Sequence, residues 1–486
     1  MACVELPTII QGGMGVGLSN WTLARQVALR GELGVVSGTA LDAVVARRLQ
    51  DGDLGGHVRR ALSHFPSPEM AARVLTHYFI AGGRSVADPY LAVPKISLKP
   101  SQAWLELSLI SNFVEVWLAK EGHGGVVGIN FLEKIQMATP AALLGAMLAD
   151  VDYVLMGAGV PREIPRLLND FARGAEGFIN IDVEGAAEPF RLVLNPVELL
   201  GAELPTLNRP CFLAIVSADV LATYLARNEA IRPDGFIVEG HLAGGHNAPP
   251  RGQMTLDEQQ EPIYGVRDEA NLAKISALGL PFWLAGAYGR PEKVAEALAS
   301  GATGVQVGTL FALCRDSGLT GELRDQLLAE LDGSGPVVKT DPLASPTGFP
   351  FKVVQLPETL SDGAVYEERP RLCDLGYLRT AFVRPNGLVG YRCPSEPVAV
   401  YLKKGGKIED TVGRQCLCNG LMANIGLGQH RLDGYVEPPI LTLGSDVEAA
   451  RALRAIHPAG WGAADVLTWL LSQVTVEIPA LVGQKR

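Results

Sequence analysis

The fold is decided by the stretch Gly235-Phe-Ile-Val-Glu-Gly-His-Leu-Ala-Gly-Gly-His-Asn-Ala-Pro-Pro-Arg-Gly252. It opens with the apolar run 236–238, which predicts a short buried strand, and the run ends in a cluster of glycines followed by His246. Glycines at the carboxyl end of a buried strand let the backbone approach a bulky ligand. A histidine directly after them would lie at the reactive face of a parallel sheet or barrel. The alternative is a glycine-rich turn with an incidental surface histidine.

Short apolar runs of the same kind recur along the chain. They lie near residues 9, 35, 127, 154, 213, 237, 283 and 306, and helical segments separate them. Strands alternating with helices imply parallel pairing, and eight such units are the number of a TIM (β/α)8 barrel. The pattern G-x-G-x-G after residue 11 is not the G-x-G-x-x-G of a dinucleotide-binding fold, so a Rossmann fold is the minor alternative.

Three segments depart from this repeat. Residues 41–123 exceed what one strand–helix unit needs, so they predict a helical insertion after the second strand. Residues 177–195 predict an inserted hairpin. Beyond residue 316 the chain becomes polar and proline-rich, and no further repeat follows. We therefore expect a barrel over 1–316 and a C-terminal appendage over 317–486 that packs on the barrel.

Composition excludes several classes of protein. Hydrophobic residues make up 48% of the 486 residues, which is typical of globular chains. The net charge of −10 argues against a nucleic-acid or anionic-membrane surface. No apolar run reaches about 18 residues and no signal peptide is recognisable, so a cytoplasmic protein without membrane spans is expected. In that compartment the seven cysteines are expected to be free, metal-binding or catalytic rather than disulfide-bonded.

Two glycine turns predict a phosphate site. Gly286-Ala287 and Gly308-Thr309 follow the last two strands, where barrels of this kind commonly bind phosphate through backbone N–H groups. The alternative is that both are ordinary strand–helix turns. A phosphate there, together with the glycine-lined first strand, fits FMN lying across the barrel mouth, and an ATP-binding P-loop motif is absent from the sequence.

With these pieces in order, the chain resembles the nitronate monooxygenase (2-nitropropane dioxygenase) family, FMN enzymes on a TIM barrel that include an FMN-dependent enoyl-acyl-carrier-protein reductase. The matching segments are residues 9–14, 33–38, 128–130, 243–246, 284–286 and 304–309. The resemblance implies a catalytic role for His246 and a cofactor site formed by Gly12, Gly13, Met14, Asn130, Gly244, Gly245, Gly286, Ala287, Gly308 and Thr309. Leu242 and Ala287 depart from the family pattern, which has Glu and Gly there.

The resemblance implies two reactions. The first is oxidation of an alkyl nitronate with O2; the alternative is reduction of an enoyl thioester with NAD(P)H, as in longer relatives that are trans-acting enoyl reductases of polyketide and polyunsaturated fatty acid synthesis. An acyl carrier protein is then a candidate partner, and a homo-oligomer is expected. The long insertion and tail favour the reductase. A non-catalytic flavin-binding protein is the lesser alternative, because such a protein needs no titratable group at His246.

The tail also carries four of the cysteines. Cys373, Cys393, Cys416 and Cys418 could form a four-thiolate metal site, but their spacing matches no standard ligand pattern. We therefore expect packed thiols and no metal.

Overall fold

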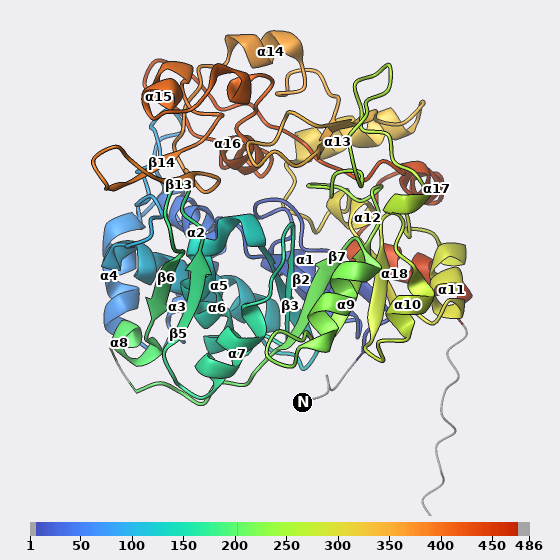
Figure 1. Ribbon diagram of the computed structural model, residues 1–486, viewed down its shortest axis with the longest axis horizontal. Helices are drawn as coiled ribbons and strands as arrows, with labels where there is room; N and C mark the ends of the chain where they lie inside the picture. Colours follow the sequence, from blue (N-terminus) through green and yellow to red (C-terminus); the bar gives the residue numbers. More distant parts are fainter. Residues whose placement is uncertain (1–5, 202, 475–486) are drawn as a thin grey trace, which may run out of the picture.

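The computed structural model describes residues 6–201 and 203–474. Its centre is a closed barrel of eight parallel strands, and their positions confirm the predicted (β/α)8 count (Figure 1). Around the barrel the strands follow one another as β1 (Ile9–Gln11), β2 (Leu33–Ser37), β3 (Val127–Leu132), β4 (Tyr153–Gly157), β7 (Cys211–Val216), β8 (Gly235–Glu239), β9 (Phe282–Ala285) and β10 (Gly304–Val307). Pairing of β1 with β10 closes the ring, with Ile9 opposite Val305.

The barrel interior is filled by large apolar side chains, and it is not a pore. Ile10, Val35, Leu155, Ile237 and Trp283 form one inner cluster. The Trp283 side chain is fully buried and its Nε1 donates to the carbonyl of Pro7, 2.7 Å away. This packing fills the interior, and a cavity lies at the carboxyl ends of the strands.

Helices that follow the strands form the outer layer: α1 (Trp21–Ala28), α6 (Thr139–Leu148), α7 (Ile164–Ala172), α9 (Asp219–Arg227), α10 (Leu272–Ser276) and α11 (Pro291–Ala299). The sequence predicts the start of α1 well, because Asn20 accepts from the N–H of Leu23 as an N-cap.

The segment between β2 and β3 is helical, as expected. It contains α2 (Leu41–Gln50), α3 (His57–Leu62), α4 (Pro68–Tyr78) and α5 (Gln102–Lys120). Only part of it is an addition to the barrel, however. The 19-residue α5 packs between α1 and α6, so it takes the ring position that belongs to the helix after β2.

The predicted hairpin is also present. β5 (Gly177–Ile181) and β6 (Phe190–Leu194) pair antiparallel beside the barrel, and the short α8 (Pro196–Leu200) follows. Its tip contacts the C-terminal part of the chain: Glu184 forms an ion pair with Arg392, with 2.5 Å between Oε1 and Nη2.

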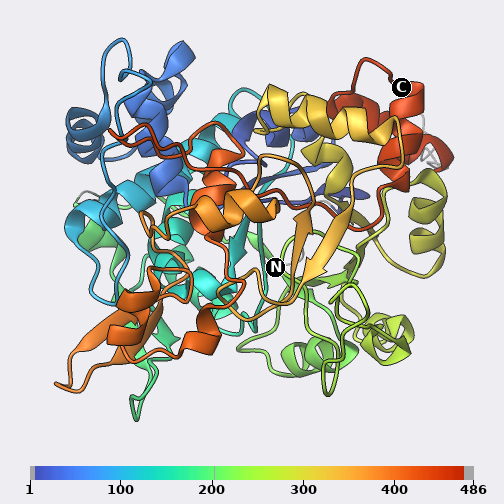
Figure 2. The same ribbon diagram turned by 90° about the horizontal axis from the view of Figure 1, so that it is seen from above.

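Most of the chain after β10 lies over the carboxyl ends of the strands (Figures 1 and 2). They form α12 (Thr309–Ala312), α13 (Gly321–Leu331), α14 (Gly363–Glu368), α15 (Val398–Lys403), α16 (Leu417–Ala423), α17 (Glu448–Ile456) and α18 (Ala463–Leu470). Two antiparallel pairs accompany them, β11 (Val338–Asp341) with β12 (Phe351–Val354) and β13 (Thr380–Val383) with β14 (Val389–Arg392).

The end of this tail returns to the barrel. Helix α18 packs against α1, α11 and α12, in the ring position that follows β10. Just before it, the fully buried Trp461 donates from Nε1 to the carbonyl of Leu310, 2.8 Å away. The outer ring of helices is therefore completed by residues from the far end of the chain.

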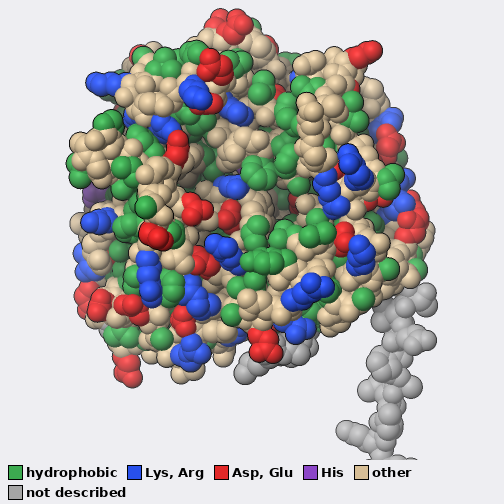
Figure 3. Space-filling view, in the orientation of Figure 1, with side chains coloured by type: hydrophobic (Ala, Val, Ile, Leu, Met, Phe, Trp, Pro, Cys, Tyr) green, Lys and Arg blue, Asp and Glu red, His purple; other side chains and the backbone are tan. Residues whose placement is uncertain are grey.

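Over the described residues, no helix is both long and apolar enough to cross a membrane. On the face shown in Figure 3, acidic and basic side chains are interspersed, with no field of one sign. The expectation that the cysteines are not disulfide-bonded is wrong for Cys211, which takes part in a disulfide.

Candidate active site

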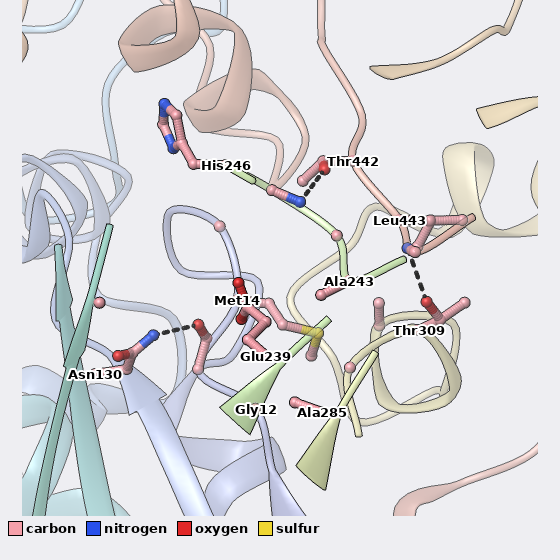
Figure 4. Close-up of a pocket in the computed structure, with 18 of the residues that line it drawn as sticks. Gly12, Met14, Asn130, Glu239, Ala243, His246, Ala285, Thr309, Thr442 and Leu443 are labelled. Carbon is pink, nitrogen blue, oxygen red and sulfur yellow. Dashed lines mark hydrogen bonds between the residues drawn. The ribbon is translucent and has the colours of Figure 1, made fainter. Parts of the chain in front are cut away.

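A cavity of about 250 Å3 opens at the carboxyl ends of the barrel strands, beneath the tail (Figure 4). Every site residue predicted from the sequence lines it: Gly12, Gly13, Met14, Asn130, Gly244, Gly245, His246, Gly286, Ala287, Gly308 and Thr309. These residues come from the ends of five strands, so the barrel brings together positions that lie up to about 300 residues apart in the sequence.

The floor of the cavity combines tight packing with unused polar atoms. Asn130 donates from Nδ2 to the carbonyl of Gly13, 2.9 Å away. A Cβ on Gly13 would lie 2.4 Å from the Cβ of Asn130, so only glycine fits. The Oδ1 of Asn130 and the Oε1 of Gln306 are buried, and neither makes a hydrogen bond to a described residue. Buried acceptors without donors are costly, so both oxygens suit a ligand that brings N–H or O–H groups.

The turn after β9 keeps a glycine-type backbone even where the sequence has alanine. Gly286 has φ +91° and Ala287 has φ +64°, both in the left-handed region. For a non-glycine residue this conformation costs about 1–2 kcal/mol. Ala287 therefore takes, at that cost, a backbone conformation that glycine adopts freely.

His246 is held by the tail. Its Nε2 lies 2.7 Å from the hydroxyl of Ser345, and its ring packs edge-on against Phe351 with centroids 4.9 Å apart. In Figure 4 the ring extends away from Gly12 and Glu239, toward the tail. Ser345 also contacts the hydroxyl of Thr347, 2.8 Å away. Nothing in the local sequence of His246 indicated Ser345, because 99 residues separate the two.

Burial lowers the pKa of His246 to about 4, and the positive charge of Lys134 acts in the same direction. At neutral pH the imidazole is therefore uncharged. It can donate one hydrogen bond and accept another, but it supplies no fixed positive charge.

Glu239 also lines the cavity, and it was not among the residues predicted from the sequence. It is the last residue of β8 and lines the cavity near Met14 and Ala285 (Figure 4). Desolvation raises the pKa of its carboxyl group to about 7, and no described residue forms a hydrogen bond or ion pair with that carboxyl. The sequence does contain a signal for this residue, because an acidic side chain directly follows the apolar run 236–238, at the predicted end of the strand.

The tail forms the roof of the cavity, and it is joined to the loop after β8. The N–H of Gly245 donates to Oγ1 of Thr442, 2.8 Å away, and the N–H of Ser445 donates to the carbonyl of Leu242, 3.0 Å away. The N–H of Gly444 donates to Oγ1 of Thr309 at 3.0 Å. The roof therefore contacts both the histidine loop and the turn after β10.

The charged side chains that line the cavity are acidic. Among the described residues that line the cavity there is no lysine or arginine, whereas Glu239 and Asp446 are acidic. The tail adds apolar side chains, namely Leu378, Leu417, Leu421 and Leu443. The described lining therefore offers apolar surface to a substrate and no cationic side chain, so an anion in this cavity would be bound by backbone N–H groups.

The tail cysteines are free in the structure. Cys393 and Cys416 are buried, while Cys373 and Cys418 are partly buried. Across the described residues, no group of three or more His, Cys, Asp or Glu side chains could hold a metal ion. Burial raises the pKa of the Cys418 thiol to about 11, so this pocket residue is a neutral thiol. Cys3 lies outside the described residues.

Comparisons with known proteins agree with the resemblance. The family model described as nitronate monooxygenase matches residues 208–339, the segment that carries the His246 loop and both turns after β9 and β10. A dehydrogenase of Mycobacterium tuberculosis, which acts by name on a 5-hydroxy-7a-methyl-1-oxo-octahydro-indene-4-carboxyl-CoA, is 30% identical over 155 residues. That match covers 31% of this chain and 39% of the relative's length. A monooxygenase family and a dehydrogenase support oxidoreductase chemistry.

Solved structures with a similar chain path include FabK from Thermotoga maritima, with a TM-score of 0.46 and 15% identity over 97% of this chain and 93% of that one. A nitroalkane oxidase from Streptomyces ansochromogenes has a TM-score of 0.43 and 15% identity, and the match covers 96% of this chain and 95% of the other.

Proposed function

We propose that this chain is an FMN-dependent oxidoreductase that works in the cavity at the barrel mouth. The observation that carries the proposal is the pair of buried amide oxygens, on Asn130 and Gln306, that have no donor among the described residues. The isoalloxazine ring and ribityl chain of FMN bring N–H and O–H donors of the kind these oxygens require.

The turns after β9 and β10 fit the phosphate end of the same cofactor. Gly286-Ala287 and Gly308-Thr309 line the cavity on the side of α11 and α12, which is the usual phosphate position in this barrel class. A Cβ on Gly308 would meet only Met14, with Sδ 3.4 Å away, so the space above this turn is open. When bound, FMN would supply reversible hydride and electron transfer.

Between the two reactions considered, the geometry favours reduction of an enoyl thioester with NAD(P)H. No described lysine or arginine lines the cavity, and His246 is uncharged, so no cationic side chain of the lining would contact a nitronate anion. The leucines of the tail suit an acyl chain. The neutral imidazole of His246 can donate a hydrogen bond to a thioester carbonyl. An acyl carrier protein or coenzyme A would carry the thioester.

Oxidation of a nitronate with O2 remains the second candidate. It is supported by the family model over residues 208–339, a segment that includes both His246 and the proposed phosphate turns. With a nitroalkane as the starting substrate, the neutral imidazole would first accept the α-proton, which leaves the nitronate to be oxidised.

The flavin is tested first. The purified protein, after reconstitution with flavin, should release FMN on heating, identified by chromatography. Gly308→Val should lose FMN because the side chain enters the phosphate turn, whereas Gly265→Val, at an exposed glycine with open space around it, should keep it. Release of FAD, or no retained flavin in the wild type, would overturn the proposal.

The reaction is tested next on the flavin-loaded protein. Rapid anaerobic bleaching by NAD(P)H, reversed by an enoyl thioester, would establish the reductase. O2 uptake with a nitronate and no nicotinamide would establish the second candidate. Flavin binding without either activity would leave a non-catalytic flavin-binding protein.

A further inference from the structure

A second cavity, of about 200 Å3, lies within the tail and outside the barrel mouth. Its lining is basic: Arg369, Arg371 and Arg414 all contribute to it, and the acidic residue among its described lining is Glu367. Three guanidinium groups around one small cavity repel each other unless negative charge lies between them.

The first of these arginines is buried and incompletely paired. Arg369 donates from Nε to Oε1 of Glu437, 2.7 Å away, and its side chain is only 5% exposed. Its Nη2 is buried and makes no hydrogen bond to any described residue. A buried cationic donor without an acceptor is costly, so this group calls for a ligand oxygen.

The other two are fixed by uncharged groups. Arg371 donates from Nη2 to the carbonyl of Thr411 at 2.7 Å, and Arg414 donates from Nη1 to the carbonyls of Leu343 and Ser345 at 2.7 and 2.6 Å. These bonds hold both side chains in place, but a carbonyl does not neutralise a guanidinium.

Most of the carboxylates nearby lie outside the cavity lining. Glu437 is engaged by Arg369, and Asp410 and Asp341 act electrostatically on Arg414 from outside the lining. Within the lining, three guanidinium groups therefore face one exposed carboxylate, that of Glu367, and Nη2 of Arg369 has no acceptor among the described residues.

We propose that this cavity binds a phosphate group, either free or carried by a phosphorylated small molecule. Guanidinium groups match the geometry of phosphate oxygens, and three of them around one site give a strong preference for a multiply charged anion. This assignment goes beyond the proposed function and does not depend on the flavin.

The position of the cavity connects it to the barrel mouth. Cys416 lines the arginine cavity, while Leu417 and Cys418 line the active-site cavity. Arg414 binds the carbonyl of Ser345, and the hydroxyl of Ser345 contacts His246. A bound phosphate would thus stiffen the segment that holds the histidine.

Calorimetric titration of the flavin-loaded protein with inorganic phosphate, at constant ionic strength set by chloride, tests the proposal. Phosphate should bind and raise the melting temperature. Arg371→Gln should weaken binding by about 10- to 100-fold, the loss expected for one charge-assisted contact. Arg379→Gln is the matched control, because Arg379 is a tail arginine that also donates to backbone carbonyls, those of Gly376 and Ile96, but does not line the cavity.

Further variants distinguish phosphate bound in the arginine cavity from phosphate bound at the proposed flavin turn. Gly308→Val, which blocks the proposed flavin turn, should leave phosphate binding intact, so failure of the flavin proposal would not mask this one. If Arg371→Gln does not fold, Arg371→Lys replaces it. Absence of binding in the wild type, or equal weakening in the Arg371 and Arg379 variants, would overturn the site.

The source of the phosphate is distinguished with a dinucleotide pair. If NADP+ competes with inorganic phosphate and NAD+ does not, the site takes the extra phosphate of the dinucleotide. If neither competes while phosphate binds, the ligand is the free anion.

Discussion

His246 is oriented by two residues of the tail, the hydroxyl of Ser345 and the ring of Phe351. We expect His246→Ala to keep FMN, because the proposed phosphate contacts come from other loops, and to lower turnover by ~10²–10⁴-fold, as for loss of a positioned acid–base group. Ser345→Ala should keep the histidine but remove the hydrogen bond that orients its ring. We expect turnover to fall by less than in His246→Ala. Steady-state rates of the three proteins, at matched flavin content, measure both effects. Full activity in His246→Ala would exclude a catalytic role.

Glu239 makes the stability of the protein depend on pH. Because its pKa rises from 4.5 to about 7 on folding, the folded chain holds a proton between these values that the unfolded chain releases. Stability from this group therefore falls as pH rises through that window. We expect Glu239→Gln to be more stable than wild type at pH 8, by about 1–3 kcal/mol, with little difference at pH 4.5.

Thermal unfolding at the two pH values checks this expectation. His246 acts in the opposite sense: its folded pKa of about 4 lies below the usual 6.5, so its contribution is lost as pH falls through that interval. Repeating the measurement in a His246→Ala background separates the contribution of Glu239 to the pH dependence of stability from that of His246. If the difference in stability between Glu239→Gln and wild type is the same at both pH values, the carboxyl group of Glu239 does not titrate as inferred.

At the scale of elements, the segment 442–445 joins the roof to the barrel. Thr442 accepts from Gly245, and Gly444 donates to Thr309. We expect Thr442→Val to fold normally but to release FMN about tenfold faster, because one of these bonds is lost. Thr380→Val, at an exposed position of β13, is the matched control. The rate of flavin release is measured by stopped-flow fluorescence. Identical release rates in Thr442→Val and wild type would mean that the roof does not retain the cofactor.

The sequence predicted the barrel strands because each is a short apolar run that ends at a glycine or polar residue. It also predicted the glycine turns, since their residue types are local. It could not predict that α5 and α18 belong to the ring, because periodicity identifies a helix but not its neighbours. Ser345 and Thr442 were missed for the same reason: each meets its partner across 99 or 197 residues of chain.

At the scale of the whole molecule, the tail both covers the site and completes the barrel. Trp461 is fully buried against Leu310, and α18 packs on α1 and α11. We expect Trp461→Ala to destabilise the chain by about 3–5 kcal/mol, since a large buried side chain leaves a cavity. Trp469→Ala, at a half-buried position of α18, should lower the free energy of unfolding by a smaller amount. Chemical denaturation followed by circular dichroism gives both values.

The same contacts predict how the whole chain unfolds. If α18 is part of the ring, a chain ending at residue 316 lacks the helix that packs on α1, α11 and α12, and it exposes Leu310 and the apolar faces of α1 and α11. We expect that truncated chain to aggregate or to lose cooperative unfolding, and the full chain to unfold in one transition by every probe. A stable, flavin-binding 1–316 fragment would instead mean that the tail is only a roof, and that the barrel needs nothing from it beyond contacts with the site.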